Sequence, residues 1–394
     1  MKKLLAIVIA ALMIVPVLAA CNTPGNQNTG DYKVAMITDY GDITDQSFNQ
    51  TTYEACLEYC DANSVEFKYY KPAGDSTAER VAKVEEAIDE GFNIIVMPGF
   101  AFAGTIYELQ DKEEYKDVKF IALDVSEYDV YSNFYQDGDM SKPLINENNT
   151  PHLNNNVYCA VYQEELCGYM AGYAAVKLGY KHLGFLGGMA VPAVIRYGYG
   201  FVQGCDAAAK ELGIESEVTV EYVYGNRFQG TPEITAYMDT WYQTTGVEVV
   251  FACGGGIYTS ATEAAKKVEN GKVIGVDVDQ AATINALGTE GMTVTSAMKG
   301  LAATVKNVLN ETIKNNNLAN FGGKIENLGL VSGTDPEANY VQIPMTSTQW
   351  ADGFTQDNYK ELVAKMFNGE ITVSNATDAA PSVSITVNYQ ANIM

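Results

Sequence analysis

The sequence predicts an α/β protein of two lobes, each built on a mostly parallel sheet with helices on both faces. Short apolar runs alternate with helical patterns along the chain, which is typical of parallel sheets. Roughly 360 residues follow the N-terminal apolar stretch, more than one hydrophobic core usually serves. Two stretches about 155 residues apart, beginning FKYYKPAGDSTAER and VEYVYGNRFQGTPEI, share one pattern of strand, polar turn, helix and glycine-rich turn. This repeat indicates two lobes of one design, although any two strand–helix–strand units look alike.

The expected strands are short and continuously apolar, as strands buried on both faces are. They are KVAMIT, VEFKYY, NIIVMP, KFIALD, VYCAVY, HLGFLGG, VTVEYVY, VEVVFA, VIGVD, MTVTSAM and NLGLVSG. A helix is expected to begin at Ser76, because Glu79 three residues later completes a capping box. Further helices are expected near Ser47, Tyr107 and Pro232, over CGYMAGYAAVKL and AATVKNVLNETIKN, from about Val194, and from Tyr359 to Phe367.

These elements divide unevenly, so the chain is expected to cross between the lobes more than once, which would form a hinge. The prediction places residues 31–155 and about 282–325 in lobe 1, and residues 156–281 and about 326–394 in lobe 2. The polar, Asn-rich stretch 125–155 is longer than ordinary loops and is expected to form a partly ordered lid or rim.

The first twenty residues are typical of a signal peptide. Lys2 and Lys3 precede the apolar run LLAIVIAALMIVPVLAA, which ends in LAAC at Cys21. This pattern predicts cleavage after residue 20, a lipid on the Cys21 thiol and a flexible tether over residues 21–30. The protein is then expected on the extracytoplasmic face of the cell membrane, attached only through its lipid. An uncleaved anchor or a plain secretory signal is the alternative.

Composition excludes some classes of function. Acidic residues outnumber basic ones 49 to 25, which argues against nucleic acid or anionic lipid as a partner. The only histidines are His152 and His182, and no Ser–His–Asp order is visible. GGGIYTS lacks the lysine of a phosphate-binding loop, and YGYGFVQG misses the dinucleotide fingerprint. We therefore expect neither an enzyme nor a bound cofactor.

The cysteines other than Cys21 give no support for a metal site, because none forms a Cys-x-x-Cys pair. We expect them to be small core residues, with one bridged pair as the alternative. They are Cys56, Cys60, Cys159, Cys167, Cys205 and Cys253.

Polar, aromatic and glycine residues gather where the predicted strands end. Ligands of open parallel sheets bind at the carboxyl ends of the strands. Carboxylates there can accept from two neighbouring hydroxyls of a ribose, aromatic faces can sandwich a base, and glycines let the backbone approach closely. Each residue alone has another explanation, since an Asp after a strand commonly caps a helix and Phe251 could be core. The residues are Asp39, Phe48, Gly99, Asp124, Asn226, Phe228, Phe251, Gly254 to Gly256, Asp277 and Lys299.

Several motifs, in order along the chain, resemble those of the basic membrane protein family. They are ITDYGDITDQSFNQ, NNNVYCAVYQEELCGYMAGYAAV, LGFLGGMAVPAVIRYGYGFVQG, VIGVDVDQ and TSAMKG. The family consists of lipid-anchored receptors that bind purine nucleosides for ABC importers. The resemblance implies the type I periplasmic-binding-protein fold, with two Rossmann-like lobes joined by three crossovers. It also implies an ABC permease and an ATPase as partners, and we expect a monomer.

The resemblance implies roles for individual residues. Phe48 and Phe251 would stack on the base, Asp39 and Asp124 would contact it, and Asp277 and Lys299 would hold the ribose. Asn49, Phe228 and Gly256 complete the expected ligand-binding set. Thr44 stands where the family often has a second acid, and Tyr197 where it usually has Phe. Asp42 and Asp45 are expected only to cap and solubilise.

The expected function is therefore a lipid-anchored receptor that binds nucleosides between its lobes and delivers them to an ABC permease. A sensor or surface antigen of the same fold that binds a sugar or another small ligand is the alternative. A third possibility is an extracellular nucleoside hydrolase.

Overall fold

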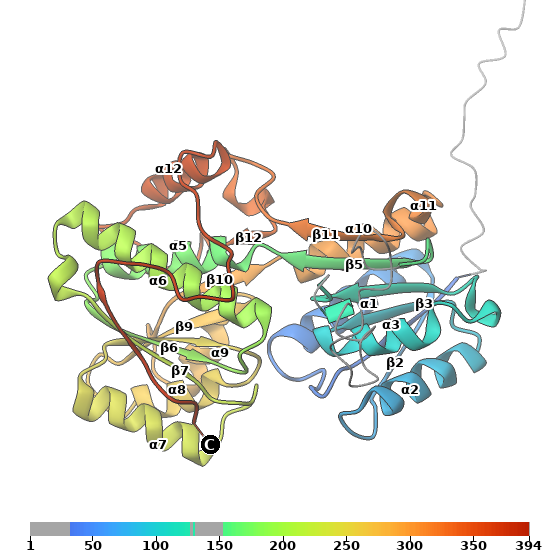
Figure 1. The fold of residues 1–394 in the computed structure, drawn as a ribbon, viewed down its shortest axis with the longest axis horizontal. Helices are drawn as coiled ribbons and strands as arrows, with labels where there is room; N and C mark the ends of the chain where they lie inside the picture. The colour runs from blue at the N-terminus through green and yellow to red at the C-terminus, as the bar shows by residue number, and fades with distance from the viewer. Residues whose placement is uncertain (1–31, 127–128, 131–152, 394) are drawn as a thin grey trace, which may run out of the picture.

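The computed structural model describes residues 32–126, 129–130 and 153–393, which form two lobes side by side (Figure 1). The expected signal peptide, tether and lipidated Cys21 lie outside the described residues, as does most of the expected lid over 125–155. Within the described part of the chain, no helix combines the length and hydropathy needed to cross a membrane.

Lobe 1 is built on a six-stranded sheet in the order β11-β5-β4-β3-β1-β2, in which every pairing is parallel. Its strands are β1 (Lys33–Ile37), β2 (Glu66–Tyr70), β3 (Ile94–Pro98), β4 (Lys119–Leu123), β5 (Val157–Tyr162) and β11 (Lys324–Leu328). Its helices are α1 (Phe48–Asn63), α2 (Thr77–Asp89), α3 (Ala103–Leu109), α10 (Leu301–Ile313) and α11 (Leu318–Phe321).

Lobe 2 is built on a seven-stranded sheet in the order β12-β10-β9-β8-β6-β7-β13. Its strands are β6 (His182–Gly187), β7 (Thr219–Tyr224), β8 (Val249–Cys253), β9 (Lys272–Asp277), β10 (Thr293–Lys299), β12 (Val341–Gln342) and β13 (Thr386–Tyr389). Its helices are α5 (Glu164–Lys177), α6 (Pro192–Leu212), α7 (Pro232–Thr240), α8 (Tyr258–Ala265), α9 (Ala281–Leu287) and α12 (Gln356–Phe367).

The two sheets repeat one topology, because β2-β1-β3-β4-β5 of lobe 1 matches β7-β6-β8-β9-β10 of lobe 2. The central strands are buried along their whole length, as their continuous hydrophobicity predicts. Ser76 caps α2 by accepting from the backbone N–H of Glu79 at 3.2 Å, and its hydroxyl donates to the Glu79 carboxylate. The predicted capping box forms only in part, because among the described residues Glu79 does not accept from the backbone N–H of Ser76. The two-lobe α/β fold expected from the sequence is confirmed.

The expected lobe boundaries need correction. The prediction placed residues 156–162 in lobe 2 and 292–298 in lobe 1, but β5 pairs with β4 and β10 pairs with β9. The chain therefore changes lobe after β5, after β10 and after β11. The physical reason is that β5 and β10 each hydrogen-bond to the strand that precedes them in the chain, β4 and β9. Each therefore belongs to the sheet that the chain is about to leave, and the crossover comes after it.

Helices α5 and α6 pack backbone to backbone, which brings the start of α5 to the cleft. A Cβ atom at Gly168 would lie 2.2 Å from the carbonyl oxygen of Tyr197, and one at Gly200 would lie 2.1 Å from that of Glu165. Only glycine permits this approach.

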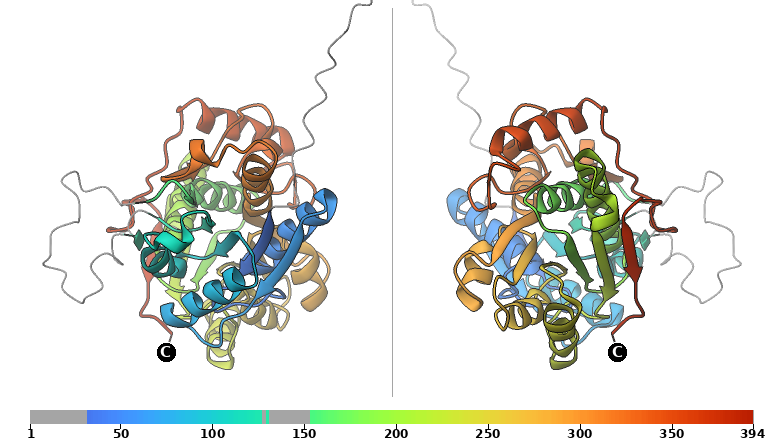
Figure 2. Two further views of the ribbon diagram at one scale, coloured as in Figure 1. Left: turned by 90° about the vertical axis from the view of Figure 1, so that its right-hand side faces the viewer. Right: turned by 90° about the vertical axis from the view of Figure 1, so that its left-hand side faces the viewer.

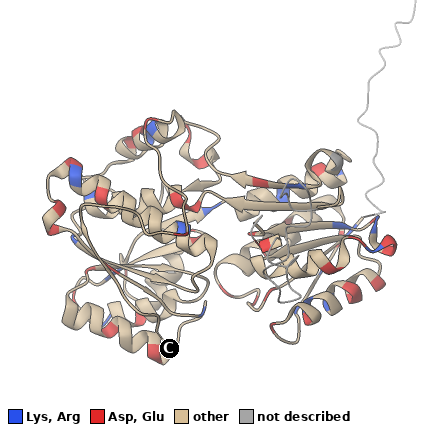
Figure 3. Cartoon of the chain, in the orientation of Figure 1, with Lys and Arg blue, Asp and Glu red and all other residues tan. Residues whose placement is uncertain are grey.

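All six described cysteines are buried and unbridged, as expected of core residues. Acidic residues are spread over both lobes with Lys and Arg between them (Figure 3).

Candidate functional site

The carboxyl ends of the strands of both lobes line one cavity of about 240 Å³. Loops after β1, β3 and β4 form one wall, and loops after β6 to β10 form the other. This is where ligands of open α/β sheets bind. Asn226 and Phe251 are not among the residues that line it. The predicted residues that line it are Asp39, Phe48, Asn49, Gly99, Asp124, Phe228, Gly254, Gly255, Gly256, Asp277 and Lys299.

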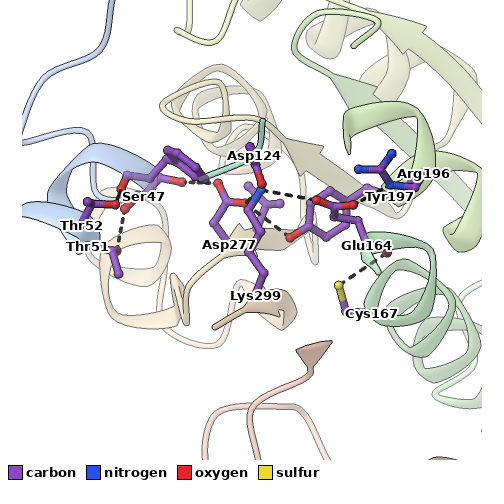
Figure 4. Close-up of polar contacts among 12 residues, drawn as sticks. Ser47, Thr51, Thr52, Asp124, Glu164, Cys167, Arg196, Tyr197, Asp277 and Lys299 are labelled. Atoms are coloured by element: carbon purple, nitrogen blue, oxygen red, sulfur yellow. Dashed lines mark hydrogen bonds and ion pairs between the residues drawn. The ribbon is translucent and has the colours of Figure 1, made fainter. Parts of the chain in front are cut away.

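Lys299 is the centre of a buried charge cluster that joins the lobes (Figure 4). Its Nζ atom lies 2.5 Å from Asp124 Oδ2, 3.5 Å from Asp277 Oδ1 and 3.7 Å from Glu164 Oε1. It also lies 4.7 Å from the ring centre of Phe48, within range of a cation–π contact. Burial lowers the pKa of Lys299, but the surrounding carboxylates outweigh it and hold that pKa above its ordinary value. The amine is therefore charged and can donate to a ligand.

Asp124 and Asp277 occupy equivalent positions in the two lobes, after β4 and at the end of β9. Both adopt the left-handed backbone conformation, with φ of 59° and 65°. This conformation is strained for residues other than glycine, and such strain concentrates at functional sites. Burial raises the pKa of Asp124, and Lys299 opposes the shift. Its Oδ1 atom is buried and accepts no hydrogen bond from the described residues.

Four residues of the cluster were not predicted as site residues. Ser47 Oγ donates to Asp277 Oδ2 at 2.7 Å across the lobes, and the Tyr197 hydroxyl donates to Asp277 Oδ1 at 3.4 Å. Glu164 is fully buried and accepts from Arg196 Nε at 2.7 Å. In the sequence Glu164 reads as an acid in the first turn of a helix, which is common for helix-dipole reasons alone. Of these four residues, only Tyr197 stood out in the sequence, because the family usually has Phe at that position.

Asp39 lies on the lobe 1 wall of the cavity, after β1, and is mostly buried. Its Oδ1 atom accepts from the backbone N–H of Gly41 at 2.6 Å and from Asn49 Nδ2 at 3.0 Å. Burial raises its pKa from 3.8 to about 6, against these hydrogen bonds. Asp45 caps α1 by accepting from the backbone N–H groups of Ser47, Asn49 and Gln50, as expected.

Replacing Asp39 by Asn is expected to stabilise the protein at pH 8 by at most about 3 kcal/mol. Because the folded-state pKa of about 6 lies above 3.8, the stabilisation from Asp39 is present below pH 3.8 and is lost as the pH rises through 6. Asn keeps the acceptor oxygen and removes the charge. Urea unfolding at pH 4 and pH 8 measures the effect.

The control for this change is Asp42→Asn, since the Asp42 side chain is 48% exposed and pairs with Lys71. It should change the free energy of unfolding by about 0.5 kcal/mol or less. If Asp39→Asn and the parent lose stability equally between pH 4 and 8, the charge of Asp39 carries no such cost.

Phe251 does not line the cavity, so the structure gives no support to its predicted stacking on a ligand. Its side chain is 0% exposed and packs edge-on against Phe185 and Tyr197, with ring centres 5.5 Å and 6.0 Å away. Phe251 lies two residues before the end of β8. Its side chain therefore enters the layer between the sheet and α6, whereas the cleft is lined by Cys253 and the glycines that follow.

Other aromatic rings line the cavity. Phe48 begins α1, and the Phe228 ring from lobe 2 stacks on the Tyr40 ring from lobe 1, with centres 6.0 Å apart and planes 13° apart. Glycines make room for Phe228: a Cβ atom at Gly188 would lie 2.5 Å from its ring, and one at Gly254 2.8 Å. The site thus combines flat apolar faces with buried carboxylates and one amine. This combination suits a small ligand that carries both a ring and neighbouring hydroxyls.

Known proteins with similar sequences and folds agree with this architecture. A family model described as "ABC transporter substrate-binding protein PnrA-like" matches residues 32–373. The "ABC transporter nucleoside-binding protein BmpA" of Lactococcus lactis is 25% identical over 79% of this chain and 85% of its own length. "Basic membrane protein B" of Borreliella burgdorferi is 26% identical over 79% of this chain and 83% of its own length.

Solved structures support the fold. A solute-binding protein of an ABC transporter from Aeropyrum pernix superposes with a TM-score of 0.63 at 18% identity, covering 88% of each chain. One from Conexibacter woesei gives 0.62 at 20% identity, covering 87% of this chain and 99% of that one. With the two-lobed fold and the cleft between the strand ends, the match over most of the chain shows that this protein belongs to the basic membrane protein family of PnrA-like ABC transporter substrate-binding proteins.

Proposed function

We propose that this protein binds a purine nucleoside in the interlobe cleft and delivers it to an ABC permease, while a lipid on Cys21 holds it at the membrane. The observation that carries the proposal is the convergence of Asp124 and Asp277 on Lys299. Adjacent ribose hydroxyls can donate to the two carboxylates and accept from the amine. The free, buried Oδ1 atom of Asp124 is an acceptor available to such a hydroxyl.

The base would lie against the aromatic wall. The Phe48 ring, beside the Lys299 amine, offers one apolar face, and the Tyr40–Phe228 pair, which also lines the cavity, offers another. Asp39 and Asn49, which also line the cavity, supply polar groups. Since Asp124 and Asp277 flank one amine, we place both at the ribose and leave Asp39 as the acidic contact to the base.

Mass spectrometry of the small molecules released when the purified protein is denatured tests this proposal. We expect a purine nucleoside in near-stoichiometric amount. A stoichiometric sugar without a base would contradict it. Incubation with inosine should release no free hypoxanthine, and steady release would instead assign a hydrolase.

Replacing Asp277 by Ala is expected to weaken guanosine binding by about 1.5–3 kcal/mol, because a charged acceptor for the ribose hydroxyls is lost. The 2′,3′-dideoxy analogue cannot make those hydrogen bonds, so its affinity should fall little. Calorimetric titration of both ligands measures the difference. The matched control is Asp279→Ala, two residues along and exposed. Equal losses for guanosine and its dideoxy analogue would assign Asp277 to structure.

A further inference from the structure

The C-terminal segment adds to lobe 2 an element that the family match does not cover. That match ends at residue 373, and β13 follows at Thr386–Tyr389. β13 pairs in parallel with β7, from Thr386 opposite Thr219 to Tyr389 opposite Tyr222. The right-hand view of Figure 2 shows it as a dark red strand at the edge of the second sheet. The equivalent edge of lobe 1 ends at β2, with no further strand among the described residues.

Buried acids fix this segment to lobe 2. Asp206 Oδ1 on α6 accepts from the backbone N–H groups of Ser384 at 2.6 Å and Ile385 at 3.2 Å. Glu221 on β7 is 6% exposed and accepts from Asn388 Nδ2 at 2.8 Å and from the amide of Gln390. Buried carboxylates need such donors. The segment is therefore docked through its backbone and its side chains.

The end of the segment reaches the loop that follows β7. The backbone N–H of Ile393 donates to the carbonyl of Tyr224 at 2.9 Å, and the Ile393 side chain is buried among apolar residues of lobe 2. Asn226 Nδ2 donates to the carbonyl of Ile393 at 3.2 Å, and Asn392 Nδ2 donates to Asn226 Oδ1 at 2.9 Å. Asn226 has a φ of 56°, a left-handed conformation that these contacts help to hold.

Asn226 stands two residues before Phe228, whose ring lines the cavity and stacks on Tyr40 of lobe 1. Gln229, the next residue, also lines the cavity and forms a bridge with Gly256. The loop is thus held on its cleft side by the glycine turn and at its start by the C-terminal segment. Among the described residues, these two hydrogen bonds are the ones that the Asn226 side chain makes.

We propose that residues 384–393 are a strap that positions Phe228 for ligand binding by fixing the backbone at Asn226. Asn392 and Ile393 are then positioning residues, because they touch the loop and not the cavity. The strap would hold Phe228 at the distance from Tyr40 and from the bound ring at which the rings stack. Loss of the strap should therefore loosen the Phe228 loop before it unfolds the lobe.

Two variants test the strap, a chain ended after Gln390 and the milder Asn392→Ala. Hydrogen exchange read by mass spectrometry should show faster exchange over residues 225–230 in both, with unchanged exchange in β8. Asn375→Ala is the matched control, since Asn375 lies in the same segment, is exposed and precedes the strap. Unchanged exchange over 225–230 in the truncated chain would overturn the proposal.

Binding gives a second readout, which rests on the proposed function. The truncation should weaken guanosine binding about three- to tenfold, as expected for the loss of hydrogen bonds that hold a contact residue. In a Phe228→Ala background the same truncation should change the affinity by less than about twofold. Equal losses in both backgrounds would assign the segment to stability alone. If the parent binds no guanosine, the proposed function fails, while the exchange experiment still decides on the strap.

Discussion

Replacing Lys299 by Met is expected to lower the free energy of unfolding by about 3–5 kcal/mol, because a buried charge pair that loses one partner leaves the other uncompensated. Lys299 is the only cation within 4 Å of Asp124 and Asp277 among the described residues, and Glu164 shares it. Met keeps most of the length of the side chain and removes the charge. The variant should also lose guanosine binding, since the donor to the ribose is gone. Urea unfolding and calorimetry measure the two effects.

Two further variants separate this loss from a general effect of removing lysine. Lys306→Met removes a lysine that pairs with Glu58 at the surface, 42% exposed, and should cost less than about 1 kcal/mol. Adding Asp124→Asn to Lys299→Met removes one uncompensated carboxylate and should restore part of the stability without restoring binding. A Lys299→Met protein as stable as the parent would contradict the charge cluster.

Phe251→Ala should mainly lower stability, whereas Phe48→Ala should mainly weaken binding. Phe251 is fully buried between rings of the core, so its loss should lower the free energy of unfolding by about 3–5 kcal/mol. Phe48 is partly buried at the cavity, so its loss should weaken guanosine binding by about 1–3 kcal/mol through lost ring contact and cost less stability.

Denaturant unfolding and calorimetry on the same preparations decide between these roles. Binding by Phe251→Ala should be near that of the parent wherever the variant remains folded. If Phe251→Ala is as stable as the parent but binds guanosine far more weakly, Phe251 contacts the ligand and the cavity described above is not the binding site.

The strand ends could be predicted from the sequence because a parallel sheet places them together. Asp124 and Asp277 each follow an apolar run, and the alternation of strands and helices is enough to bring both to one cleft. Phe251 also belongs to such a run, but only the exact end of β8 decides whether its side chain faces the cleft or the core. The expected strand VEVVFA ends one residue before β8 does, and Phe251 lies deeper in β8 than the residues that line the cavity.

Contacts between distant elements could not be predicted. The bond between Glu164 and Arg196 depends on the close packing of α5 and α6, which the glycines permit but do not specify. The lobe boundaries depended on which sheet takes up β5 and β10. Strand β13 has four residues and exists through its pairing with β7, so its local sequence gave little signal.

Calorimetric titration of guanosine into protein that has been unfolded, freed of co-purified ligand and refolded tests the central claim most directly. We expect one site per chain, with a dissociation constant in the micromolar range or tighter, and no binding of ribose alone at the same concentrations. Absence of heat from every purine nucleoside at millimolar concentration, in protein whose circular dichroism shows complete refolding, would contradict a nucleoside site in this cleft.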